Sequence, residues 1–312
     1  MDPLADTYSK SQTESRELPS LPEWEPYAID IFAITAVAVV LLLVSKTPAS
    51  FQNQLVQRYN DPSLHALYTT HFVHQSAEHL RGNLVSYLVT VPLTYVICLR
   101  AGRHREFRQA FLGVLFVLPP LISVVSLFGF DIVVEVLLGV DPNVKTSRGF
   151  SALDGAFVGV LLVAVADLLR TANSCEGSVS SVVGALFCIG LGGGFWNVFE
   201  YTTSVYAIVL VLLPVGYGVW LVRSVDETYR IGAGLQSGGW LRGEYLVGGL
   251  LLAGSFAAAW GVQGLLAFPW FTGGTNTLTH FVGLVAGVGM GVVCFGDVGP
   301  SSPSTNILKR SW

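Results

Sequence analysis

Residues 151–169 read SALDGAFVGVLLVAVADLL, a stretch in which only two side chains are acidic and none is basic. Because about 20 apolar residues of helix cross the hydrocarbon core of a bilayer, this stretch has the length and character of a transmembrane helix. Ser151, Gly155 and Gly159 recur at every fourth position. In a helix these small residues share one face, and such a face lets another membrane helix approach closely.

Seven further apolar windows predict an all-α polytopic membrane protein with about eight spans. A kink is expected at Pro119-Pro120, inside one of these windows. Another window, 179–196, is short and glycine-rich, so it is either a full span or a re-entrant segment. The eight windows are 27–44, 79–99, 107–130, 151–169, 179–196, 203–222, 245–267 and 277–294.

The composition excludes several classes of protein. Charged residues make up 12% of the 312 residues and hydrophobic residues 52%, whereas soluble domains carry about 25% charged residues. No stripe of Lys and Arg exists outside short loops, which excludes a nucleic-acid partner. The polar stretches 1–26 and 297–312 are expected to be solvated tails that flank a membrane domain at 27–296.

The basic residues predict the orientation in the membrane. Loops on the cytoplasmic side carry more Lys and Arg, and a cytoplasmic N-terminus places most of the chain's 17 basic residues inside. The long connections at 45–78 and 131–150 then face outside. The basic residues placed inside are Lys10, Arg16, Arg100, Arg103, Arg105, Arg108, Arg170, Arg223, Arg230, Arg242, Lys309 and Arg310.

Three motifs fall near the outer ends of three predicted helices. The first is His74-x4-His79-x3-Asn83, in which His79 and Asn83 are one helical turn apart and share a face. The second is Gly149-Phe150-Ser151, at the start of the window quoted above. The third is His280, which begins a row of small residues on the last span, Gly283, Gly287 and Gly291.

Two glycine-lined faces predict that the helices of Ser151 and His280 pack together. A serine hydroxyl is a weak nucleophile at neutral pH, and an imidazole within about 2.6–3.2 Å activates it by taking its proton. Acyl transfer also needs donors for the developing oxyanion, which His79, Asn83 and the backbone N–H of Ser151 are placed to supply. Membrane serines more often serve only in packing, and helix-end histidines often lie in the interface.

The polar residues of these motifs and their neighbours also allow other interpretations. The histidines at 65, 71, 74 and 79 suggest a metal site, but neither an HExxH motif nor a carboxylate-rich third ligand accompanies them, so no metal is expected. Asp154 is either an anion in the first turn of its helix or a group facing water in the site, and the sequence leaves both open.

Taken together and in this order, the three motifs resemble those of the rhomboid intramembrane serine proteases. The resemblance implies a six-helix core, here with two additional helices between the catalytic partners. It implies a dyad without an acidic member, in which Ser151 is the nucleophile and His280 the general base, while His79 and Asn83 line the oxyanion hole. His74 would shape the outer end of that helix, and Gly149, Gly155, Gly159, Gly283 and Gly287 would support the site.

The resemblance also implies partners and a location. The substrates would be single-span membrane proteins cut within or near their transmembrane segment, with no cofactor, at a site near the outer face of a prokaryotic cell membrane. Departures are also present: Ala152 stands where glycine is commoner, Gly155 stands where many members have a tyrosine that stacks on the histidine, and the first outer loop has no Trp-Arg pair. Phe157, or an aromatic residue of another helix, would then stack on His280 in place of that tyrosine.

Two alternatives belong to other functional classes. An inactive rhomboid-like protein would bind transmembrane segments for quality control or trafficking, although such relatives usually lack the serine or the histidine. A transporter would carry broken helices with polar residues at mid-bilayer, whereas the polar cluster here lies near one interface.

Overall fold

The computed structural model describes residues 25–131, 146–173, 250, 253–258, 260–262 and 277–296. The predicted spans at 179–196 and 203–222 lie outside these residues, as do the C-terminal tail and all of the N-terminal tail except residues 25 and 26. The predicted span at 245–267 is described only in part. Within the described residues the protein is mostly helical, with one two-stranded sheet.

Four described helices, or runs of helix, are long and apolar enough to cross a membrane, which by length and composition indicates a multi-pass membrane protein. They begin where the sequence predicts, or up to three residues earlier. A fifth apolar helix, α12 (Thr277–Phe295), is slightly shorter by the same criteria. The four are α1 (Glu25–Ser45), α4 (Ala77–Arg100), the run His104–Gly129 and α7 (Ser151–Asn173).

The third of these spans changes its helical form part of the way along. It consists of α5 (His104–Leu112), a π-helical turn η2 (Gly113–Val117) and α6 (Leu118–Asp131). Pro119 and Pro120 follow the π turn after one residue, Leu118, and their missing N–H groups leave the carbonyls of residues 115 and 116 without an α-helical donor. The irregularity predicted at the two prolines therefore takes the form of a π turn just before them.

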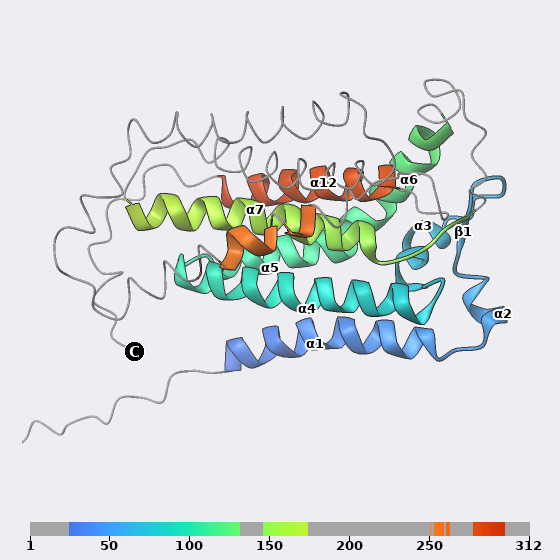
Figure 1. Cartoon of the computed structure of the whole chain (residues 1–312), viewed down its shortest axis with the longest axis horizontal. Helices are drawn as coiled ribbons and strands as arrows, with labels where there is room; N and C mark the ends of the chain where they lie inside the picture. The colour runs from blue at the N-terminus through green and yellow to red at the C-terminus, as the bar shows by residue number, and fades with distance from the viewer. Residues whose placement is uncertain are drawn as a thin grey trace, which may run out of the picture.

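Helix α7 forms the centre of the described bundle. In its most apolar window 94% of the residues are buried, against 28% for α1 at the edge. Figure 1 shows α12 alongside α7, with α4 between these helices and α1. The core around α7 includes a group of aromatic rings, in which Phe157 packs against Tyr87, Phe111 and Phe150.

A folded connection joins α1 to α4 at the end of the bundle where α7 begins (Figure 1). It contains two single-turn helices and one 3-10 turn, namely α2 (Ala49–Gln52), α3 (Ala66–Thr69) and η1 (Thr70–Phe72). Its short strand β1 (Gln57–Arg58) pairs antiparallel with β2 (Thr146–Ser147), which leads into α7. The connection is thus tied to the chain just before Ser151.

Ion pairs fix the opposite end of the bundle. The buried carboxylate of Asp30 on α1 accepts hydrogen bonds from Arg108 Nε (2.7 Å), from the Tyr95 hydroxyl (3.1 Å) and from His104. Arg103 Nε donates to the Asp167 carboxylate of α7 at 3.0 Å. Because charges in an apolar bundle are costly unless paired, these contacts specify how α1, α4, α5 and α7 meet.

Candidate active site

Ser151 is the first residue of α7, and the backbone before it has a conformation that requires glycine. Gly149 has φ +127°, a region that residues with a side chain rarely adopt. A Cβ atom at Gly149 would also lie 2.6 Å from Cε1 of the His79 ring. The N–H of Gly149 donates to the Thr70 carbonyl at 3.1 Å, so the turn is held by η1.

His280 lies in the first turn of α12 and reaches Ser151 from there. Its Nε2 atom is 2.7 Å from the hydroxyl oxygen of Ser151, across 129 residues of sequence. This is the hydrogen bond that a serine nucleophile and its base require. The structure therefore brings together the two residues that the sequence pairs as a dyad.

Glycine makes the close approach of the two helices possible. A Cβ atom at Gly283 or at Gly287 would lie 2.0 Å from the carbonyl oxygen of Ala152 or of Ala156, respectively, and one at Gly159 would lie 2.4 Å from that of Leu284. Side chains at these positions would push the helices apart and separate Ser151 from His280. Gly155 is also buried on α7.

A pair of hydroxyl groups joins α12 to α6 beside His280. The hydroxyls of Thr279 and Ser126 lie 2.6 Å apart, and both side chains are buried. The Tyr59 hydroxyl lies 3.4 Å from the same Ser126 oxygen. Sequence reasoning missed these residues; the available signal was the pair Ser123 and Ser126, which share a face of an otherwise apolar window.

Asn83 lies one helical turn beyond His79 in α4 and holds the backbone at Ser151. With its amide oxygen turned toward His74, that oxygen accepts from His74 Nε2–H at 2.9 Å and from the backbone N–H groups of Phe150 and Ser151 at 3.2 and 3.3 Å. This orientation satisfies all three donors. The sequence predicted that the N–H of Ser151 would face an oxyanion, but this N–H donates to the Asn83 amide oxygen instead. The NH2 group of the same amide remains as a donor.

The two histidines of the first motif lie against each other. His79 is half-buried in the first turn of α4, where Ser76 caps the helix by accepting from the His79 N–H. The rings of His74 and His79 meet edge to face with centroids 5.3 Å apart. His74 precedes the helix and contacts Asn83 rather than only shaping the helix end. Burial lowers the pKa of His74 to about 4, so it is neutral at pH 7.

His71 fastens the connection between α1 and α4 to helix α6. Its Nε2 atom lies 3.0 Å from both the Pro119 carbonyl oxygen and the Ser123 hydroxyl on α6. Burial lowers the pKa of His71 to about 4, so this ring is also neutral. Among the described residues no group of three or more His, Cys, Asp or Glu side chains is arranged to hold a metal ion.

Asp154 faces the protein interior and not an open cavity. Its side chain is buried, and neither carboxylate oxygen has a hydrogen-bond partner among the described residues. Of the two interpretations left open by the sequence, the structure thus disfavours a group exposed to water.

Comparisons with known proteins give no family for this chain. No family model matches it, and neither the curated proteins nor the solved structures include a match. What the described residues establish is a helical protein with four apolar helices of membrane-spanning length, in which a serine and a histidine are hydrogen-bonded at one end of the bundle.

Proposed function

We propose that the protein is an intramembrane serine endopeptidase of the rhomboid type, which cuts the transmembrane segments of single-span membrane proteins. The observation that carries the proposal is the 2.7 Å contact between the Ser151 hydroxyl and His280 Nε2. Two more observations support it. Ser151 and His280 are both half-buried at one end of the bundle, and His79 and Asn83 lie beside them, Asn83 within 3.3 Å of the Ser151 N–H.

In the proposed reaction His280 first acts as the general base. Its Nε2 atom takes the proton of Ser151 as the hydroxyl oxygen attacks the carbonyl carbon of the scissile peptide bond. The negative charge that develops on the carbonyl oxygen is stabilised by N–H groups of the Asn83 amide and of the His79 ring. The amide oxygen of Asn83 faces three donors, the Nε2–H of neutral His74 and the backbone N–H groups of Phe150 and Ser151, and this fixes the orientation in which the NH2 group is the donor for the oxyanion.

The second half of the reaction regenerates the enzyme. The protonated imidazole of His280 gives its proton to the leaving amine, and an acyl-enzyme on Ser151 remains. A water molecule, deprotonated by His280, then attacks this ester, and His280 returns the proton to the Ser151 oxygen as the carboxylate product leaves. In the proposed orientation the N-terminus is cytoplasmic and the Ser151 end of the bundle faces outside.

Labelling with a fluorophosphonate probe tests the proposed nucleophile. We expect the full-length protein in detergent to be labelled, and Ser151→Ala and His280→Ala to lower the rate of labelling by at least about 10³-fold. Ser147→Ala, four residues away on β2, is the matched serine control and keeps full labelling. Labelling that survives Ser151→Ala contradicts the assignment.

Cleavage of a single-span reporter protein, reconstituted with the enzyme in liposomes, tests the substrate class. Cleavage that depends on Ser151 and His280 supports a protease. A folded protein that binds the reporter but neither cleaves it nor reacts with the probe would instead be an inactive, segment-binding relative of such proteases.

A further inference from the structure

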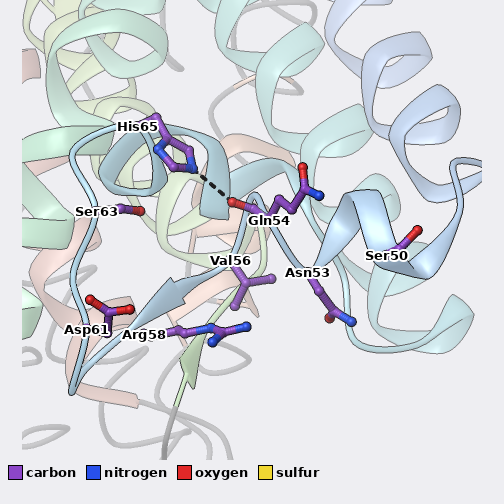
Figure 2. A pocket seen from close by; sticks show the side chains of 8 residues that line it. All are labelled: Ser50, Asn53, Gln54, Val56, Arg58, Asp61, Ser63 and His65. Atoms are coloured by element: carbon purple, nitrogen blue, oxygen red, sulfur yellow. Dashed lines mark hydrogen bonds between the residues drawn. The ribbon is translucent and has the colours of Figure 1, made fainter.

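A cavity of 510 Å³ opens in the connection between α1 and α4, away from Ser151. Figure 2 shows it enclosed by α2, by β1 and by the turn that leads to α3. The hydrogen bond between His65 Nε2 and the Gln54 carbonyl oxygen, 2.9 Å long, closes one side. Its lining residues are Ser50, Asn53, Gln54, Val56, Arg58, Asp61, Ser63 and His65.

The lining combines polar and apolar surface and contains one basic and one acidic side chain, Arg58 and Asp61. Arg58 and Asp61 both have exposed side chains, and the ion pairs found in the described residues all involve other residues. The lining also holds the hydroxyls of two serines and the amides of Asn53 and Gln54, each of which can donate a hydrogen bond, together with Val56 and His65. Such a surface fits a ligand with an anionic oxygen group at one end and a hydrogen-bond donor at the other.

Two exposed apolar side chains stand next to lining residues in the sequence. Leu64 is 88% exposed and Phe51 is 46% exposed, and each is adjacent in sequence to lining residues. The cavity begins only five residues after the end of α1, whose Leu43 is also exposed. A hollow with charged and hydrogen-bonding lining residues and exposed apolar neighbours, placed just after the end of an apolar helix, has the character of the boundary between headgroups and acyl chains.

From this arrangement we infer that the cavity binds the headgroup of a phospholipid. Arg58 binds the phosphate, and Asp61 accepts a hydrogen bond from the hydroxyl or ammonium group at the end of the headgroup. The acyl chains lie against Phe51 and Leu64. Apolar contacts of this kind distinguish a lipid from a soluble phosphate, which would meet only the lining.

The bound headgroup would support the segment that carries Ser151. Arg58 on β1 pairs with Thr146 on β2, and Ser147 of β2 accepts a hydrogen bond at its carbonyl from the Thr70 hydroxyl. The Thr70 carbonyl in turn accepts from the N–H of Gly149. A ligand that fixes β1 therefore also restricts the turn before α7. The binding site itself stands independently of the function proposed for Ser151.

Native mass spectrometry of the full-length protein, released from an uncharged detergent, tests the inference. With dioleoyl phosphatidylglycerol as the probe, we expect Arg58→Gln to weaken binding of the first lipid by roughly tenfold, the loss of one charge-assisted contact. Arg81→Gln is the matched control, since it removes an exposed arginine outside the cavity, and it should bind as the unaltered protein does. Asn53→Trp, which fills the cavity, should also abolish tight binding of the first lipid.

Two results would overturn the inference. One is equal lipid binding by the Arg58→Gln, Asn53→Trp and Arg81→Gln proteins, which would place the lipid elsewhere. The other is binding of sn-glycerol 3-phosphate as tight as that of the lipid, which would make the cavity a site for a soluble phosphate ester. Either result can be read without any measurement of Ser151 reactivity.

Discussion

Single glycines decide whether α7 and α12 can meet. Gly287→Ala and Gly283→Ala each place a Cβ atom 2.0 Å from a backbone carbonyl oxygen of α7, which cannot move without shifting the helix. We expect each change to lower the free energy of unfolding by about 1–3 kcal/mol, as overpacking does. The Ser151 hydroxyl and His280 would also separate, and the proposed reactivity would fall with the stability. Thermal unfolding of the purified protein and labelling by the fluorophosphonate probe measure the two effects.

Gly289→Ala provides the matched control, because a Cβ atom at Gly289 on the same helix meets nothing within 4 Å. Alanine has a higher helix propensity than glycine, so this change should leave stability unaltered or raise it by up to about 1 kcal/mol. Equal loss of stability in the Gly287 and Gly289 variants would contradict the close packing of α7 against α12.

At the scale of the residue, spacing alone predicted much of this contact. Ser151, Gly155 and Gly159 recur every four residues, and Gly283 and Gly287 form the facing row, so the two helical faces could be identified without coordinates. The roles of Ser126 and Thr279 could not be predicted in this way, since a hydroxyl in an apolar helix can also bond to a carbonyl of its own helix. Only the approach of α6 to α12 shows that these two hydroxyls bond to each other.

At the scale of the element, the connection from α1 to α4 is held by two buried, neutral histidines. The pKa of His71 and that of His74 are each lowered to about 4, from an ordinary value of about 6.5 in an unfolded chain. Below pH 6.5 the unfolded chain gains protons that the folded protein does not. Stability is therefore fully present above pH 6.5 and is lost as the pH falls toward 4.

We expect the melting temperature of the full-length protein in detergent to fall between pH 7 and pH 4, with a contribution of about 3 kcal/mol from each histidine. His71→Gln removes one of these titrating groups, so its melting temperature should depend less steeply on pH. His65→Gln, which changes an exposed histidine, should retain the original dependence. The same dependence in the His71→Gln and His65→Gln proteins would show that His71 is not buried in its neutral form.

Apolar length predicted the described spans to within a few residues, because crossing a bilayer sets a minimum number of apolar residues. The small elements of the connection, α2, α3, η1 and β1, were not predicted. Each is too short to show a hydrophobic period, and each is held by contacts with distant segments. One example is the pairing of Gln57 with Ser147.

At the scale of the whole molecule, the number of crossings follows from the direction of two helices. Both α7 and α12 begin at the end where Ser151 contacts His280, so the chain between them must cross an odd number of times. The helical residues 253–258 and 260–262 belong to the last return. A Cβ atom at Gly254 would lie 2.6 Å from Val165, and one at Gly261 would lie 2.6 Å from Val158, which makes this segment antiparallel to α7.

The segments 179–196 and 203–222 therefore cross as a pair or not at all, and their apolar character predicts that both cross. A cysteine introduced as Thr202→Cys, in a protein whose four native cysteines are replaced by serine, should then lie on the same side as Ser151. A membrane-impermeant maleimide should label it together with Glu78→Cys, which is exposed at that end, and from the side opposite to Arg105→Cys. Labelling of Thr202→Cys from the same side as Arg105→Cys would contradict this prediction. The segments 179–196 and 203–222 would then not cross, and the predicted number of spans would fall from eight to six.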